Sequence, residues 1–215
     1  MIKGAIFDLD GTLLDSMHVW DNIGEEYLAA KGVTPPPDLR FRLKTMSLLQ
    51  TAKYVRGELG VTDSCEEIMG EINRMVEDKY LYEVPLKPYA AEFLQELKDA
   101  GVRICIASAC DPYLGKAALQ RLSILSYFSD IITCAEVGSG KDEPEIFEHA
   151  LARLGTEKSQ TVVFEDALHA IETAVKAGFR VVAINDPSTA DESDKIQMLA
   201  EQSIHSFKEC EVTKL

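Results

Sequence analysis

The spacing of short apolar segments rich in β-branched residues constrains the fold most strongly. Five such segments are found in the 215 residues: 2–7, 102–107, 130–134, 161–164 and 180–184. Segments of helical period lie between the later ones, near 88–100, 111–121, 143–154 and 167–177. Strands that alternate with helices over short connections form parallel sheets, and strands that are apolar throughout are covered on both faces. We therefore predict an α/β fold with a Rossmann-like, doubly wound parallel sheet.

The region 15–84 interrupts this alternation. Three helix-like stretches without a convincing strand follow one another there, about 15–31, 38–57 and 65–82. Their position directly after the first strand places them above its carboxyl end, where open α/β sheets bind ligands. We predict that 15–84 is a small inserted α-helical cap domain that can open and close over a site. The α/β core domain would then consist of 1–14 and 85–215.

The composition limits the partners. Lys and Arg number 22 against 36 Asp and Glu, a net charge of −14, and no run of five basic residues is present. Nucleic acid and anionic membranes are therefore excluded as main partners. No apolar stretch reaches the roughly 18 residues of a transmembrane helix. The five cysteines lack CxxC spacing, which is typical of reduced thiols. We expect a cytoplasmic protein, and a monomer because a small cap can close the site without a partner.

The first apolar segment ends in two carboxylates, in the order Asp8-Leu9-Asp10-Gly11-Thr12. Residues i and i+2 of an extended chain point to the same side, so both carboxylates can address one small volume. Such a pair suits a hard divalent cation such as Mg²⁺. One carboxylate could attack an electrophile while the other moves a proton. The Thr12 hydroxyl is expected to orient the first aspartate. The alternative is an Asx turn that ends the strand.

Two further strand ends carry groups that can bind phosphate. Ser108 follows the segment 102–107, and its hydroxyl with the next N–H groups, starting at Ala109, could hold a phosphate at a helix N-terminus. A serine at this place could equally be a helix cap. Lys141 follows two glycines in the loop after 130–134 and could neutralise a phosphoryl group. The alternative is a solvated surface lysine.

More acid follows the segment 161–164, as Glu165 and Asp166. Asp166 by itself could be the N-cap of the next helix. Because the carboxyl ends of parallel strands share one edge of the sheet, both residues can join Asp8 and Asp10. Together these carboxylates would form an oxygen-rich cation site.

Taken in chain order, the four strand ends resemble the motifs of the haloacid dehalogenase-like phosphohydrolase superfamily. The resemblance is to helical-cap subfamily I, in the β-phosphoglucomutase-like phosphatase group. It covers essentially the whole chain. The first motif is Asp8 to Thr12, Ser108 matches the second, Lys141 the third, and Glu165 with Asp166 the acidic fourth.

The resemblance implies roles for these residues. Asp8 would be the nucleophile that forms an aspartyl-phosphate, and Asp10 the general acid and then the base, with Thr12 completing the motif. Ser108, Ala109 and Lys141 would hold the transferring phosphoryl group. Mg²⁺ would be held by four residues: Asp8, Asp10 through its backbone carbonyl, Glu165 and Asp166.

We therefore predict a Mg²⁺-dependent phosphatase for a small phosphorylated metabolite, with sugar phosphates among the candidates. The first alternative is a hexose-phosphate mutase of the β-phosphoglucomutase kind. The segment 43–48 lacks the arginine-bearing loop of such mutases. The second alternative is a binding protein that kept the fold, although every catalytic position is filled. Asp142 stands where the family usually has proline. His18 and Lys44 are the candidate substrate contacts in the cap.

Overall fold

A computed structural model describes residues 2–215. Its centre is a six-stranded sheet in the order β3-β2-β1-β4-β5-β6, in which every neighbouring pair is parallel. The strands are β1 (Gly4–Phe7), β2 (Arg103–Ser108), β3 (Ile131–Thr133), β4 (Thr161–Glu165), β5 (Arg180–Ile184) and β6 (Gln202–Ile204). The predicted doubly wound parallel sheet is thus confirmed.

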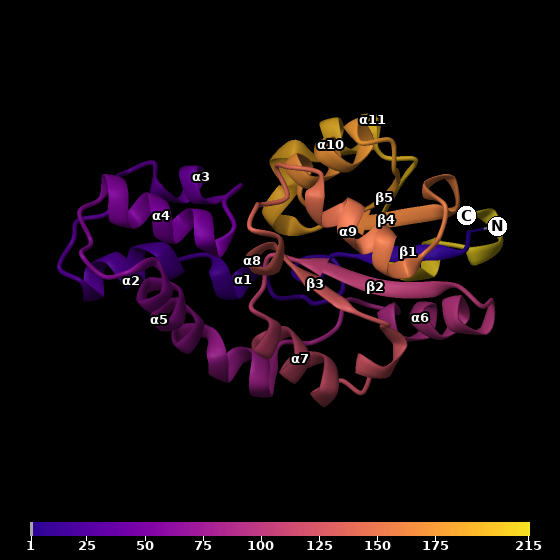
Figure 1. The fold of residues 1–215 in the computed structure, drawn as a ribbon, viewed down its shortest axis with the longest axis horizontal. Coiled ribbons are helices and arrows are strands. Elements are labelled where there is room, and N and C mark those ends of the chain that lie inside the picture. Colours follow the sequence, from indigo (N-terminus) through magenta and orange to yellow (C-terminus); the bar gives the residue numbers. More distant parts are fainter. Residues whose placement is uncertain (1) are drawn as a thin grey trace.

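Helices cover both faces of the sheet (Figure 1). One face carries α6 (Ala90–Asp99) and α7 (Pro112–Arg121), and the other carries α9 (Glu145–Leu154), α10 (Leu168–Lys176) and α11 (Ser193–Leu199). Successive strand side chains alternate between the faces, so Phe7 packs on the α6 side and Ile6 on the α9 side. None of the described helices has the length and apolar composition needed to cross a membrane.

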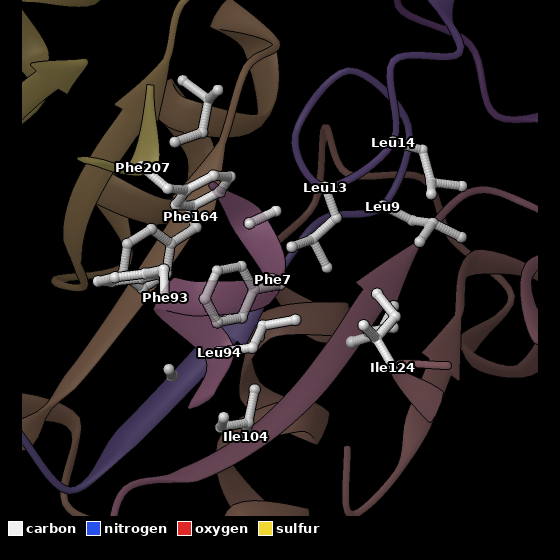
Figure 2. Close-up of a cluster of buried hydrophobic side chains, with 14 of the residues drawn as sticks. Phe7, Leu9, Leu13, Leu14, Phe93, Leu94, Ile104, Ile124, Phe164 and Phe207 are labelled. Carbon is white, nitrogen blue, oxygen red and sulfur yellow. The ribbon is translucent and has the colours of Figure 1, made fainter. Parts of the chain in front are cut away.

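An aromatic cluster anchors β1 from the α6 side. Phe7 stacks on Phe164 of β4 with ring centroids 4.3 Å apart, and Phe93 and Phe207 pack around the pair (Figure 2). Aromatic pairs of this kind contribute beyond the area that they bury. The cluster holds the ends of β1 and β4 side by side, directly before the residues with candidate chemistry.

The chain between β1 and α6 forms a separate group of helices, hereafter the helical segment (residues 17–83), at the left of Figure 1. Its elements are α1 (Met17–Trp20), α2 (Ile23–Ala30), α3 (Leu39–Leu43), α4 (Leu48–Glu58), α5 (Cys65–Asp78) and the π-helical turn η1 (Lys79–Glu83). Part of its apolar surface packs into a cluster of its own, formed by Tyr27, Leu28, Leu39, Ala52, Val55, Val61, Ile68 and Ile72.

Two of the three helices predicted in this region are interrupted. The stretch 15–31 is divided at Asn22, whose backbone leaves the helical conformation. The stretch 38–57 is divided before Ser47, which forms a reciprocal capping box with Gln50 and so begins a new helix, α4. Both positions were missed because apolar periodicity continues across them.

The C-terminal region contains structure that the sequence pattern did not indicate. Strand β6 extends the sheet, and Phe207 after it is buried in the aromatic cluster. The strand is only three residues long and carries no apolar run, so the sequence pattern gives no signal for it. Short elements complete the chain: η2 (Leu125–Tyr127), α8 (Cys134–Val137), η3 (Lys158–Gln160), η4 (Pro187–Glu192), η5 (Phe207–Glu209) and η6 (Val212–Lys214).

The strand order brings four loops to one edge. The chain adds β2 and β3 on one side of β1, and then crosses to add β4 on the other side. A reversal of this kind opens a crevice at the carboxyl ends of the strands. The residues after β1, β2, β3 and β4 meet there and face the helical segment across a cavity.

Candidate active site

The turn after β1 sends its two carboxylates into the cavity. Leu9 is buried in the apolar core, whereas Asp8 and Asp10 on either side of it line the cavity. The Asp8 N–H donates to the Phe164 carbonyl of β4 at 2.9 Å, which prolongs the strand pairing by one residue. The alternation predicted from the spacing is therefore present.

A buried lysine links two of the four strand ends. The Lys141 Nζ forms ion pairs with Asp8 and, at 2.9 Å, with the Glu165 carboxylate. All three residues are buried. Burial alone would lower the pKa of Lys141, but the two carboxylates raise it by more than burial lowers it. The pKa of Lys141 is therefore above its ordinary value, and the ammonium form is retained. The alternative of a solvated surface lysine is thus wrong.

Thr12 differs from expectation. Its hydroxyl donates to Asp166 Oδ1 at 3.0 Å, and not to Asp8. The reason is the turn at Gly11, whose φ of +88° favours glycine. A Cβ atom at Gly11 would collide with the Asp166 carboxylate, so the backbone passes directly against that side chain. Thr12 therefore orients the fourth motif.

Three carboxylates form a candidate cation site. Oxygens of Asp8, Glu165 and Asp166 lie within 4.8 Å of one another. Asp8 Oδ2 is buried and has no hydrogen-bond partner in the described part of the chain. Burial and the charge of Glu165 raise the pKa of Asp8 to about 7, although Lys141 acts against them. Burial and the charges of Glu165 and Asp8 raise the pKa of Asp166 well above its ordinary value.

The charge balance matches a divalent cation. Lys141 is the ammonium that pairs with this group, and it offsets one of the three negative charges. With all three carboxylates ionised and no cation bound, two buried negative charges would be uncompensated, which is costly in a site of low polarity and agrees with the raised pKa values of Asp8 and Asp166. A cation with oxygen ligands, such as Mg²⁺, fits both the free Asp8 Oδ2 and this balance.

The Asp10 side chain is not one of these three clustered carboxylates. Its Oδ1 accepts hydrogen bonds from Ser16 Oγ at 2.6 Å and from the Tyr80 hydroxyl. Burial and the charge of Asp8 raise the pKa of Asp10 to about 6. A carboxyl group with a raised pKa can hold a proton near neutral pH, as a general acid must.

Neither Ser108 nor Asp166 is the N-cap of the helix that follows it, so the interpretation of these two residues as helix caps is wrong. The N-cap of α7 is Asp111, which accepts from the Tyr113 N–H, whereas Ser108 Oγ accepts from the Cys110 N–H at 3.0 Å. The residue that precedes α10 is Ala167 and not Asp166. Ser108 is buried at the cavity and Ala109 is exposed to it.

The cavity has a volume of about 850 Å³ and lies between the strand ends and the helical segment. Lys44 lines it and forms ion pairs with Glu192 at 2.7 Å and Asp191 at 3.3 Å. His18 is exposed on α1 and is not among the lining residues. Of the two candidate substrate contacts, the structure brings only Lys44 to the cavity.

Comparisons with known proteins agree with this arrangement. The family model of haloacid dehalogenase-like hydrolases matches residues 2–178. The chain belongs to this family. The predicted family and its hydrolase class are thereby confirmed.

Relatives of this haloacid dehalogenase-like hydrolase include proteins named as phosphatases. Hexitol phosphatase A of Escherichia coli K12 is 25% identical over 214 residues, which cover 99% of this chain and 94% of the relative. The phosphorylated carbohydrates phosphatase of Thermotoga maritima is 25% identical over 210 residues, covering 94% and 96%. The crystal structure of CbbY from Rhodobacter sphaeroides with phosphate shares the fold, with a TM-score of 0.84, 24% identity and coverage of 97% and 96%.

Two further polar contacts of this hydrolase cross from the helical segment to the strand-end loops, and both escaped the sequence analysis. Gln50 of α4 donates to the Asp142 carboxylate at 3.0 and 3.2 Å, and Asn73 of α5 donates to Asp111 at 2.9 Å. Asp142 was noticed as a departure from proline, and it now has a partner. No signal pointed to Asn73, which lies in an ordinary amphipathic helix.

Proposed function

We propose that this protein is a Mg²⁺-dependent phosphatase that hydrolyses a small phosphomonoester through an aspartyl-phosphate on Asp8. The observation that carries the proposal is the meeting of Asp8, Lys141, Glu165 and Asp166 in one buried group beside Asp10. Such a group costs stability unless it binds something, and the positive groups needed for a phosphoryl group are local despite the net charge of −14.

The first step forms the covalent intermediate. An Asp8 carboxylate oxygen attacks phosphorus, the bond from phosphorus to the leaving oxygen breaks, and Asp10 transfers a proton to that oxygen. Lys141 and Ser108 hold the phosphoryl oxygens and offset their charge, which is the main protein contribution to phosphoryl transfer.

The second step releases phosphate. Water attacks the phosphorus of the aspartyl-phosphate, its proton returns to Asp10, and the bond from phosphorus to the Asp8 oxygen breaks. Asp10 is thereby restored as an acid for the next substrate. Mg²⁺ would be held by Asp8, Asp166 and the Asp10 carbonyl, with Glu165 assisting, and would offset the negative charge between Asp8 and the phosphoryl group.

The helical segment acts as a cap in this proposal, with 15–84 as the inserted domain and 1–14 with 85–215 as the core. Its bridges to the core, Gln50 to Asp142 and Lys44 to Glu192, are consistent with closure over the cavity. Closure would exclude bulk water from the intermediate and select the substrate. We also propose that the protein is a monomer, since a small cap can close the site without a partner.

The cavity wall favours a substrate with a single phosphate. The cationic side chains that the helical segment contributes to the lining, Arg40 and Lys44, are already paired with carboxylates. Acidic residues of the lining away from the strand ends are more numerous: Asp21, Glu25, Asp38, Glu172, Asp191 and Glu192. A second phosphate would be repelled there, which disfavours the mutase alternative. The two phosphatase relatives point to a hydroxylated leaving group.

The test is phosphate release from a panel of phosphomonoesters that includes hexitol, glycerol and hexose phosphates. We expect release that requires Mg²⁺, is lost with a chelator and is lost in Asp8→Asn. Conversion of β-glucose 1-phosphate to glucose 6-phosphate, with a bisphosphate activator, is followed in parallel. Isomerisation without net phosphate release would overturn the proposal in favour of the mutase.

A further inference from the structure

Tyr80 reaches the catalytic turn from outside the motifs. It lies in η1, the last turn of the helical segment before the chain returns to the sheet, and its side chain is fully buried. Its hydroxyl donates to Asp10 Oδ1. An aromatic hydroxyl in this position adds nothing that packing needs, because phenylalanine would fill the same apolar space.

The hydroxyl of Tyr80 is held from its other side by Trp20 of α1. Trp20 Nε1 donates to the Tyr80 oxygen at 2.8 Å, and the two rings pack edge to face with centroids 6.2 Å apart. With its lone pair occupied by the indole N–H, the Tyr80 hydroxyl proton is directed to Asp10. Trp20 thus donates to Tyr80, and Tyr80 donates to Asp10, so the hydrogen bonds run in one direction from α1 through η1 to the catalytic turn.

The core fixes the backbone of η1. Arg121 of α7 donates through Nε to the Tyr80 carbonyl at 3.3 Å and through Nη2 to the Val84 carbonyl. Tyr80 is thus attached to the core by its backbone and to α1 by Trp20. Both attachments fix the position of its hydroxyl relative to Asp10.

We propose that Tyr80 is a positioning residue that sets which oxygen of Asp10 carries the transferable proton. Ser16 and Tyr80 both donate to Oδ1, and neither donates to Oδ2. An oxygen that accepts two hydroxyl donors is held as an acceptor, so the acidic proton resides on Oδ2. This inference rests on the proposed function, in which the proton passes from Asp10 Oδ2 to the leaving oxygen as the bond from phosphorus to that oxygen breaks.

The test compares two leaving groups in Tyr80→Phe. An alkyl phosphate such as glycerol 2-phosphate needs a proton on its leaving oxygen, whereas p-nitrophenyl phosphate releases a weakly basic phenolate. We expect kcat/KM to fall about 10- to 100-fold for the alkyl phosphate, and far less for p-nitrophenyl phosphate. kcat/KM reports the step that forms the intermediate, so the later hydrolysis does not obscure the difference.

Tyr27→Phe is the matched control. Tyr27 is a buried tyrosine of the same helical segment, and its hydroxyl has no hydrogen-bond partner among the described residues. We expect its kcat/KM to match that of the wild type for both substrates. A second arm adds Tyr80→Phe to Asp10→Asn, where no further loss is expected because the group that it positions is gone.

The outcomes separate the two proposals. Equal losses for both substrates in Tyr80→Phe, or a further loss on the Asp10→Asn background, would overturn the positioning role. If the wild type released phosphate from neither substrate, the proposed function itself would fail. If Tyr80→Phe does not fold, Trp20→Phe takes its place, since it removes the donor to Tyr80, and a selective but smaller loss is expected.

Discussion

Two lysines in this molecule each form ion pairs with two carboxylates, but they differ in how deeply they are buried. Lys141, at the sheet edge, lies between Asp8 and Glu165, and Lys44, in the helical segment, contacts Asp191 and Glu192. The Lys141 side chain is 5% exposed, whereas that of Lys44 is 31% exposed. Burial therefore decides what each cluster can do.

The buried carboxylates of the Lys141 cluster destabilise the protein, and a bound ligand of positive charge can remove this cost. The charges of this cluster lie in a region of low polarity, where removal of one partner leaves the others uncompensated. The exposed cluster is screened by water and salt, and such pairs contribute little to stability. We infer that chemistry depends on the first cluster, and contact between the helical segment and the core on the second.

The largest expected effect separates Asp8, the proposed nucleophile, from the exposed Asp191. Asp8→Asn removes the carboxylate that would form the intermediate, so we expect no detectable phosphate release. Asp191→Asn makes the same chemical change in the exposed cluster and should retain most of the activity. Steady-state assays with Mg²⁺ measure both. Comparable activity in the two variants would contradict the inference that chemistry depends on the buried cluster.

Replacement of each lysine tests the energetic difference directly. Lys141→Met should lower kcat about 10²- to 10³-fold, as loss of a charge-stabilising donor does. It should also cost about 3–5 kcal/mol of unfolding free energy, since it leaves buried carboxylates unpaired. Lys44→Met should cost no more than about 1 kcal/mol. Urea denaturation in a chelator gives the unfolding free energies of both variants. Equal losses of unfolding free energy would contradict the distinction between the two clusters.

Metal binding should distinguish the clusters in the absence of substrate. Mg²⁺ at about 100 times its Kd should stabilise the wild type by about 2.7 kcal/mol, since it binds only the folded state. Asp166→Asn removes one of the three clustered carboxylates and should lose most of this gain. The matched variant Asp191→Asn should keep it. Thermal unfolding with and without Mg²⁺ is the measurement, and an unchanged shift in Asp166→Asn would exclude this site.

A third lysine provides an intermediate case with a pH dependence. Lys87 pairs with the buried Asp186 and, at 3.3 Å, with the exposed Asp15. Burial alone would raise the pKa of Asp186, but hydrogen bonds from Lys87 and Ser188 hold it below its ordinary value. The folded pKa is thus below the unfolded value of about 3.9, so ionised Asp186 stabilises the fold above that pH.

Asp186→Asn should therefore destabilise the protein by about 1–3 kcal/mol at neutral pH. The difference from the wild type should shrink as the pH falls through the folded pKa of Asp186, because both chains are then uncharged at this position. Urea denaturation in steps from pH 7 to about pH 3 follows this loss. A difference that stays constant with pH would show that the charge of Asp186 does not stabilise the fold.

The parts of the site that could be predicted are those set by strand ends. Asp8, Ser108 and Asp166 each lie at the carboxyl end of a strand that is visible as an apolar run, and parallel strands bring these ends to one edge. The interruption before Ser47 and the short strand β6 could not be predicted, because apolar periodicity carries no signal for either.

The sequence by itself determined the sheet, the insertion and the identity of the charged groups at the strand ends, because these depend on local periodicity and on residue type. Only the tertiary structure decided the partners. Thr12 binds Asp166 because the backbone turns at Gly11, and Tyr80 binds Asp10 across 70 residues of chain. A side-chain hydrogen bond requires placement to within a few tenths of an ångström. Such placement results from the packing of whole elements and is not encoded in any one segment.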